Sequence, residues 1–255
     1  MNQIHLAPDK REMYWSRGWT VIEGVFDANE LDPVIEIATE LCEHELSKSL
    51  NYHFDQDPKG QLAAPRKLDQ PFLRHPDLRR FVLDGRLRSL IEQFIGAPPL
   101  LVQDQIFMKP PHFGSAKPYH QDNAYFLCHP DDEVLTAWIA LDDVNETNGC
   151  LRYIEGSHRG PILKHHEISE QENYHQAPAD EEIDLNCEVL ALVKKGGVVF
   201  HHSKTLHTSH RNESDQWRRA YATHWASAGV VSELDTIKNS YYNCHTDLYH
   251  EALGN

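Results

Sequence analysis

The first hundred residues carry hydrophobic positions mainly at helical spacing. Residues 18–26 (GWTVIEGVF) form an apolar run rich in β-branched and aromatic residues, which predicts one strand. Asp27 and Glu30 then make a capping-box pattern ahead of apolar residues that recur every three or four positions, which predicts a helix from about Glu30 to Leu46. The chain therefore begins as a mainly helical region with a single strand.

A second helical stretch follows a break in this periodicity. Residues 49–71 contain Pro and Gly and show no regular spacing, so we expect a loop there, and we hypothesise that it covers a site. Helical spacing resumes in HPDLRRFVLDGRLRSLIEQFIGAPP, with Pro76 near its N-terminus and Gly96 where a C-cap is expected. We interpret residues 1–99 as a mainly helical N-terminal part.

From residue 100 onward the pattern changes to short β-type runs separated by turns. The runs are LLVQDQIFMK, PYHQDNAYF, VLTAWIALDDV, GCLRYIEGS, EVLALV, GGVVFHHS, TLHTSHR and RRAYATHWAS. Many short strands after a helical start indicate an α+β protein whose later part is an antiparallel sandwich or jelly roll. We expect a double-stranded β-helix (jelly-roll, cupin-like) core at residues 100–228, with the N-terminal helices packed on one of its sheets.

The domain organisation is expected to be simple. We see no linker or repeat that would divide the chain, and a β-rich domain commonly reaches this size, so we expect a single domain over residues 1–255. One stretch, residues 161–187, is polar, acidic and long for a connection between strands. We interpret it as an insertion that acts as a lid.

Composition argues against several classes of protein. The formal charge of −15, with scattered Lys and Arg, argues against a nucleic-acid binder, which needs a basic face. No apolar run has the roughly 18 residues of a membrane span, and MNQIHLAPDKREMYW lacks the apolar region of a secretory signal. Five cysteines without a CxxC pair favour reduced thiols. We expect a cytoplasmic protein whose partner is a small molecule; the oligomeric state is open.

Two metal-ligating residue types stand two positions apart in KPYHQDNAYF. In a strand, alternation would point His120 and Asp122 to one face, and TLHTSHRN supplies His207 a further 85 residues on. Two His and one carboxylate on one side of a metal are typical of Fe(II) oxygenases, because the opposite positions stay open. An HxD pair alone is a weak signal in a chain with 18 His, and a polar strand pair is the simpler alternative.

An arginine pair follows the distal histidine. Arg218 lies eleven residues after His207, in the strand-like run WRRAYATHW. A guanidinium near a metal suits a dicarboxylate, because its fork makes a bidentate, charge-assisted pair that Lys cannot reproduce. Alternation lets only one of Arg218 and Arg219 face the interior. Spacing does not decide which, and a surface arginine is the alternative for either.

These segments together resemble the phytanoyl-CoA dioxygenase family of Fe(II)/2-oxoglutarate oxygenases. The resemblance runs over about residues 19–225 and is strongest in QDQIFMKPP, YHQDNAYF, TAWIALDDVNETNGCLRYIEGSHRG, GGVVFHHSKTLHTSHRN and WRRAYATHW. It implies iron ligands at His120, Asp122 and His207, and it places the family's 2-oxoglutarate arginine at Arg218 rather than at its neighbour.

The same resemblance implies further contacts with the co-substrate. They fall at Gln105, Trp138 and Ser209, and more loosely at Lys67. The family position that Gln105 fills is variable. Each of the others has a simpler interpretation: Trp138 could belong to the core, Ser209 could satisfy a turn, and Lys67 could be a solvated loop residue.

Three other histidines lie near the distal ligand in the sequence. His201, His202 and His210 flank His207 with the wrong spacing and partners for ligands. We interpret them as residues of the surrounding shell or of the surface.

The resemblance also implies a reaction. Fe(II), 2-oxoglutarate and O₂ would act together, with succinate and CO₂ formed as a small-molecule substrate is hydroxylated. Family halogenases have a small residue where Asp122 stands here, so hydroxylation, or a related oxidation such as desaturation, is expected. The alternative is a cupin-like metalloprotein, an isomerase or a small-ligand binding protein, that is not an oxygenase.

The substrate is not identified by the sequence, because one fold serves many substrates. Acidic residues of the 161–187 insertion would suit a cationic substrate, although a solvated surface is the simpler interpretation. Cationic side chains outside it could equally receive an anion. The acidic residues are Glu181, Glu182 and Asp184, and the cationic ones are Lys109, Lys117 and Arg152.

Overall fold

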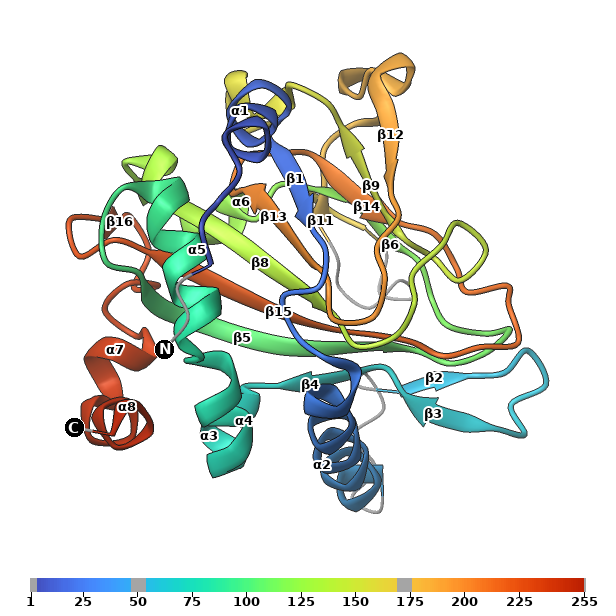
Figure 1. Ribbon diagram of the computed structural model, residues 1–255. Helices are drawn as coiled ribbons and strands as arrows, with labels where there is room; N and C mark the ends of the chain where they lie inside the picture. The colour runs from blue at the N-terminus through green and yellow to red at the C-terminus, as the bar shows by residue number, and fades with distance from the viewer. Residues whose placement is uncertain (1–3, 47–53, 169–175, 255) are drawn as a thin grey trace.

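A computed structural model describes residues 4–46, 54–168 and 176–254. Its helices are α1 (Pro8–Arg17), α2 (Ala28–Leu46), α3 (Pro71–Arg74), α4 (Pro76–Val82), α5 (Gly85–Ile95), α6 (Asn123–Phe126), α7 (Tyr241–Cys244) and α8 (Thr246–Leu253), as Figure 1 shows. None of the helices in these ranges is long and apolar enough to cross a membrane. Short 3₁₀ turns span Asp131–Glu133, Ser157–Arg159, Asp180–Glu182 and Leu185–Cys187.

Two antiparallel sheets face each other. The larger has the strand order β1 (Trp19–Ile22), β13 (Val198–His202), β8 (Val134–Ala140), β15 (Arg218–Ala226), β5 (Leu100–Lys109) and β4 (Lys67–Asp69). The smaller has the order β12 (Glu188–Ala191), β9 (Leu151–Ile154), β14 (His207–Ser209) and β6 (Lys117–His120). Neighbouring strands come from distant parts of the chain, as in a jelly roll.

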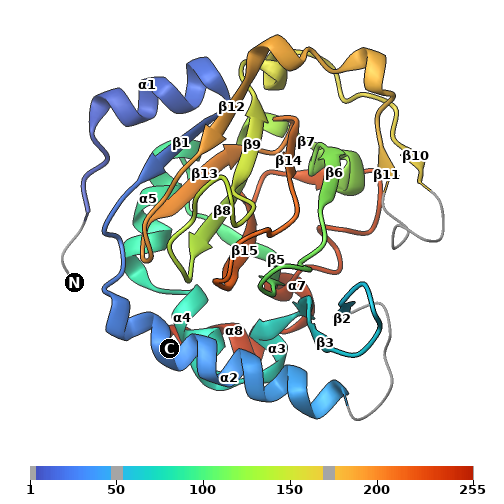
Figure 2. The same cartoon turned by 90° about the vertical axis from the view of Figure 1, so that its right-hand side faces the viewer.

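Three short strand pairs lie outside these two sheets. They are β2 (Phe54–Gln56) with β3 (Ala63–Pro65), β7 (Cys128–His129) with β16 (Val231–Ser232), and β10 (His166–Glu167) with β11 (Gln176–Ala177). Figure 2 shows β10 and β11 at the edge of the molecule, away from the helices that lie below the sheets.

Alternation along the central strands sorts side chains between two environments. On β15, Tyr221 and Trp225 are fully buried in the cluster beneath the helices, whereas Ala222 and His224 face the space between the sheets. β5 has the same division, since Ile106 belongs to the helix side. The period of two in the sequence thus supplies one core face and one face that can carry a site.

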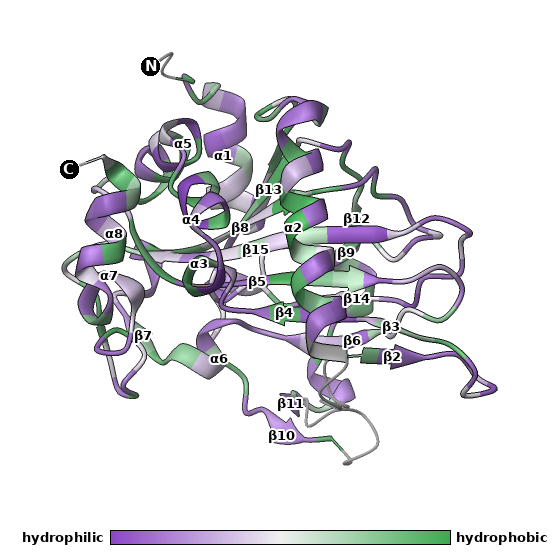
Figure 3. Cartoon of the chain, turned by 90° about the horizontal axis from the view of Figure 1, so that it is seen from below, coloured by the Kyte–Doolittle hydropathy of each residue, from purple (hydrophilic) through white to green (hydrophobic). Residues whose placement is uncertain are grey.

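The helices cover the outer face of the six-stranded sheet. Leu87, Leu90, Ile91 and Phe94 of α5 repeat at helical spacing and are buried, and each such side chain contributes about 1.5–3 kcal/mol. The C-cap is Gly96, which has a left-handed backbone (φ 73°) as predicted. Figure 3 shows α2 banded in hydrophobic and hydrophilic residues, as expected for a helix with one buried side.

The prediction of a loop at residues 49–71 is wrong in part. Residues 47–53 lie outside the described residues, but 54–69 form three short strands, and β4 adds to the edge of the larger sheet. These strands have three residues each, too few to show a period in the sequence. The pairing of Lys67 with Phe107 and Leu68 with Ile106 holds β4 in place.

Two C-terminal helices were not predicted. They are tied to the core by Asp104, whose carboxylate accepts hydrogen bonds from Tyr221 (2.5 Å) and from Tyr241 of α7 (2.7 Å). Tyr249 of α8 accepts one from the backbone of Leu101 (3.2 Å). Polar anchoring of this kind leaves little trace in the hydrophobic pattern.

The predicted fold class, an α+β jelly roll with helices on one sheet, is confirmed. The expectation that the chain is a single domain, with residues 161–187 as a lid, stays a prediction.

Candidate metal centre and its cavity

Three side chains from separate elements meet between the sheets. His120 ends β6 and lies directly opposite His207 of β14, and Asp122 follows at the start of α6. The Nε2 atoms of both imidazoles lie 3.7 Å from Oδ1 of Asp122, and all three residues are at most 6% exposed. One ligand atom from each lies within 4.8 Å of the others. This spacing fits a single metal ion bound on one side.

The local structure of the HxD segment differs from the prediction. We expected His120 and Asp122 to share a strand face, but β6 ends at His120. Asp122 has a helical backbone (φ −57°, ψ −40°) and begins α6. The two side chains converge because the chain turns sharply after the strand, not because side chains alternate.

Backbone carbonyls orient both imidazoles. Nδ1 of His120 donates to the carbonyl of Pro118, and Nδ1 of His207 donates to that of Thr205, each at 2.9 Å. This fixes the tautomer in which the Nε2 lone pair points to Asp122, the arrangement common among metal-ligating histidines. Burial is the main cause that lowers the pKa of His207 to about 3 and holds the pKa of His120 well below its usual range. Both rings are neutral at pH 7, as ligation requires.

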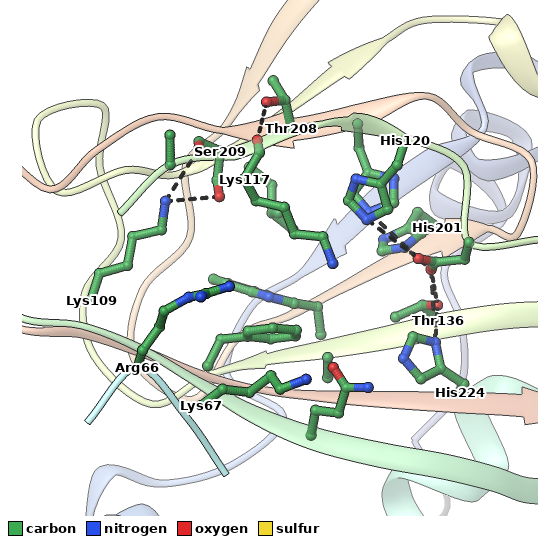
Figure 4. Close-up of a pocket in the computed structure, with 18 of the residues that line it drawn as sticks. Arg66, Lys67, Lys109, Lys117, His120, Thr136, His201, Thr208, Ser209 and His224 are labelled. Atoms are coloured by element: carbon green, nitrogen blue, oxygen red, sulfur yellow. Dashed lines mark hydrogen bonds and ion pairs between the residues drawn. The ribbon is translucent and has the colours of Figure 1, made fainter. Parts of the chain in front are cut away.

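The second oxygen of Asp122 is held by a network that the sequence did not reveal. Oδ2 accepts hydrogen bonds from Thr136 (2.6 Å) and from Nε2 of His201 (3.0 Å), as Figure 4 shows. Tyr153 donates to Nδ1 of His201 (2.7 Å), and Nδ1 of His224 donates to Thr136 (2.8 Å). His201, interpreted as a shell residue, therefore supports a ligand directly. The network leaves Oδ1 free to face the metal position.

Electrostatics keep Asp122 ionised. Burial alone would raise the pKa of its carboxyl group. The neighbouring His207 and the hydrogen bond from His201 outweigh burial and hold the pKa well below its usual value.

The three side chains open onto a cavity of about 590 Å³ between the sheets. It lies within the 300–1,000 Å³ typical of small-molecule sites. All the residues that the sequence assigned to the co-substrate line it, namely Lys67, Gln105, Trp138, Ser209 and Arg218.

Arg218 points into the cavity and Arg219 does not. Arg218 is 2% exposed, its Cζ lies 5.5 Å from the centre of the Trp138 ring, and its Nε has no hydrogen-bond partner among the residues that the structure describes. Arg219 instead makes a bidentate pair with Asp142 at 2.7 and 2.8 Å. Burial lowers the pKa of Arg218 to about 10, so the guanidinium stays charged at pH 7.

Ser209 is close to a cation that the sequence did not single out for the co-substrate. Its hydroxyl accepts from the ammonium of Lys109 (2.8 Å), and Lys109 is the cross-strand neighbour of Arg218. Burial, followed by the charge of Arg218, holds the pKa of Lys109 well below its usual range. A carboxylate placed between these groups would relieve that cost. The register of β5 against β15 brings them together, and no local motif signals it.

The remaining predicted contacts lie on β4 and β5, in the same sheet as Arg218. Lys67 of β4 faces the cavity but is ion-paired with Asp69 at 2.8 Å. Gln105 of β5 pairs across the sheet with Ala222 and lines the same wall. Figure 4 shows Lys67 near the bottom of the cavity, below both His120 and Lys117.

The 161–187 insertion contacts the residues around Asp122. The side chain of Gln121 donates to the carbonyl of Pro161 (3.2 Å) and accepts from the backbone of Leu163 (2.8 Å). Tyr125 donates to the carbonyl of Gln176 (3.0 Å). The insertion is thus hydrogen-bonded to residues next to Asp122 both before and after residues 169–175, which lie outside the described residues.

A jelly roll with a buried two-histidine, one-carboxylate cluster between its sheets defines a class of mononuclear metalloenzyme. A profile of the phytanoyl-CoA dioxygenase (PhyH) family matches residues 14–220, and the chain belongs to that family. This confirms the predicted class, an Fe(II)- and 2-oxoglutarate-dependent oxygenase that uses O₂.

Two relatives illustrate the match. The chain is 29% identical over 228 residues to a probable alpha-ketoglutarate-dependent hypophosphite dioxygenase of Stutzerimonas stutzeri, covering 87% of this chain and 79% of that protein. It is 28% identical over 237 residues to the peroxisomal phytanoyl-CoA dioxygenase of Homo sapiens, covering 88% of this chain and 69% of that one.

Solved structures share the fold. EvdO2 from Micromonospora carbonacea var. aurantiaca, complexed with 2-oxoglutarate, superposes with a TM-score of 0.72 at 24% identity, covering 92% of this chain and 96% of that one. The alpha-ketoglutarate-dependent carbocyclase SnoK from nogalamycin biosynthesis has a TM-score of 0.69 at 24% identity, with 95% and 90% covered.

Proposed function

We propose that this oxygenase hydroxylates a small organic molecule, with iron held by His120, Asp122 and His207 and with 2-oxoglutarate held by Arg218. The observation that carries the proposal is the Arg218 guanidinium, buried with its Nε unpartnered in the same cavity as the three ligands. A buried charge without a partner is costly, and a carboxylate ligand removes that cost.

The co-substrate would lie along the wall formed by β14 and β15. Arg218 and Ser209 would bind its distal carboxylate, with Lys109 adding a second positive charge. Trp138 would form the flat surface beside it, since the guanidinium already lies over that ring. Gln105 and Lys67 would make the more distant contacts, from the neighbouring strands β5 and β4.

Each protein group has a defined part in the reaction. Bound iron would supply the oxidative decarboxylation of 2-oxoglutarate to succinate and CO₂, coupled to oxidation of the substrate. The neutral imidazoles of His120 and His207 offer their Nε2 lone pairs, and the hydrogen bonds to Asp122 hold its Oδ1 in place. The apolar and aromatic walls limit water in the cavity.

The intact Asp122 favours hydroxylation, or a related oxidation, over halogenation. The family match also favours an oxygenase over a non-oxygenase cupin-like protein. Substrate identity does not follow from the family, since the names of its relatives include hypophosphite and phytanoyl-CoA. We propose a small-molecule substrate and a cytoplasmic location, with neither nucleic acid nor membrane as partner.

The proposal is tested by anaerobic addition of Fe(II) and 2-oxoglutarate. We expect the weak visible charge-transfer band of 2-oxoglutarate chelated to iron. His207→Ala should abolish the band, because it removes one of three ligands. The matched control, His210→Ala, changes an exposed histidine three residues away and should keep the band. A folded wild-type protein that binds iron yet gives no band would refute the proposal.

A further inference from the structure

The cavity carries more positive charge than iron and the co-substrate require. Five cationic side chains line it, whereas Asp122 is the one carboxylate among its described lining residues. The five are Arg66, Lys67, Lys109, Lys117 and Arg218. Two further carboxylates, Asp55 and Asp69, act electrostatically on these cations although they do not line the cavity.

The charges do not balance once the site is loaded. The three carboxylates offset three of the five cations, and Fe(II) and the dianionic 2-oxoglutarate offset each other. Two positive charges remain in a cavity between the two sheets, where charges interact more strongly than in bulk water. If Lys109 is counted as neutral because of its lowered pKa, one excess charge still remains.

Of the three cavity lysines, Lys117 alone makes no ion pair or hydrogen bond through its ammonium within the described part of the chain. Lys109 donates to Ser209 and to the carbonyl of His210, and Lys67 is ion-paired with Asp69. The Lys117 ammonium has no hydrogen-bond acceptor among the described residues and lies 5.3 Å from the centre of the Phe107 ring. Figure 4 shows its side chain reaching into the middle of the cavity.

Metal binding makes this position less favourable. Burial lowers the pKa of Lys117 to about 8, and the opposing influence is the charge of Asp122. Iron bound to Asp122 would neutralise that attraction and add a positive charge nearby. The ammonium then needs a different anion, and the distal carboxylate of 2-oxoglutarate is already assigned to the Arg218 wall.

We propose that Lys117 binds the oxyanion head group of a small anionic substrate, a carboxylate, phosphonate or phosphate ester. The assignment rests on the function proposed above. β6 carries Lys117 three residues before His120, so the head group would lie beside the metal centre. The cavity of about 590 Å³ leaves room for a small organic acid together with the co-substrate.

Matched probes test the charge preference. Hexanoate, pentylphosphonate, hexanamide and hexylammonium share a short alkyl chain and differ in head-group charge. Each is titrated calorimetrically into the anaerobic protein loaded with Fe(II) and 2-oxoglutarate. We expect at least one of the two anions to bind about tenfold more tightly than the amide and the ammonium, and the better anion identifies the head group. Equal binding of all four, or no binding of either anion, would overturn the proposal.

Variants then test the residue. Lys117→Gln should weaken anion binding about tenfold, Lys117→Arg should retain most of it, and neither should change the 2-oxoglutarate concentration at half-maximal charge-transfer band by more than about twofold. Lys194→Gln, which removes an exposed lysine paired with Asp143, is the control and should bind as wild type. Weaker 2-oxoglutarate binding in Lys117→Gln would assign Lys117 to the co-substrate and overturn the proposal.

The two proposals fail in different ways. A wild-type protein without the charge-transfer band contradicts the function but not the anion site. In that case the same titrations on metal-free protein decide the assignment of Lys117. Anion binding that Lys117→Gln abolishes supports the site, and binding that it leaves unchanged overturns it.

Discussion

Replacing Arg218 with Met tests the strongest electrostatic contact in the site. Met has a length and an apolar character close to those of the Arg218 stem, so it can still pack against Trp138, but it has neither charge nor donors. We expect iron binding to survive, because Arg218 contacts none of the three ligands in the structure. The affinity for 2-oxoglutarate should fall sharply.

The size of the effect follows from burial. Arg218 is 2% exposed, and removing one partner of a buried charge pair costs about 3–5 kcal/mol. Lys109 remains beside Ser209 and can still donate to the carboxylate, so the lower half of this range applies. The dissociation constant of 2-oxoglutarate should therefore rise about 10²- to 10³-fold. Arg218→Lys keeps the charge but loses the bidentate fork, and the rise should be about tenfold.

Titration of the charge-transfer band with 2-oxoglutarate measures this constant directly. Arg219→Met is the matched control, since Arg219 is the neighbouring arginine and its guanidinium pairs with Asp142 rather than facing the cavity. A rise of less than about threefold for Arg218→Met, or equal rises for both variants, would show that Arg218 does not hold the co-substrate.

Two further predictions concern histidines that are not expected to bind iron. His201→Phe removes one of the two hydrogen bonds to Oδ2 of Asp122, so iron affinity, measured by competition with a chromophoric chelator, should fall about 10- to 100-fold. Burial lowers the pKa of His202 in the folded protein to about 4. As the pH falls below about 6.5, this histidine therefore binds a proton in the unfolded chain before it does so in the folded one. His202 therefore contributes a loss of up to about 3 kcal/mol in unfolding free energy between pH 6.5 and 4, which His202→Gln should remove in urea titrations.

Each of these has a clear contrary result. Unchanged iron affinity in His201→Phe would mean that Thr136 alone holds Asp122. An equally steep loss of stability toward low pH in His202→Gln and in wild type would place the acid sensitivity on other groups.

The sequence predicted those parts of the site that spacing along one strand can encode. The strand at Leu100–Lys109 coincides with the run LLVQDQIFMK, and the buried Arg218 lies where the family spacing placed it. The strand follows from its pattern of residues, whereas the choice of Arg218 over Arg219 came from the resemblance to the family. Alternation can be recognised in the sequence alone, because residues two positions apart in a strand share a face whichever strand lies beside them.

Contacts across strands could not be predicted in this way. Lys109 forms a hydrogen bond with Ser209, which is 100 residues away in the sequence, and His201 forms one with Asp122, which is 79 residues away. The register between strands decides such meetings, and a shift of one residue would turn each side chain to the other face. The anionic preference inferred for the cavity rests on this three-dimensional grouping of cations, although the chain as a whole carries −15.

The arrangement around Asp122 also shows why the three proposed ligands converge although the local structure predicted for this segment was wrong. The expected strand would have placed both side chains by alternation, whereas the turn into α6 frees the carboxylate to present two different oxygens. Oδ1 faces both imidazoles, and Oδ2 satisfies Thr136 and His201, which are buried donors. Loss of the carboxylate would therefore leave two buried donors unpaired, at about 1–3 kcal/mol each, besides removing a ligand. The core around this position is built for a carboxylate, which supports hydroxylation rather than chemistry that needs the position vacant.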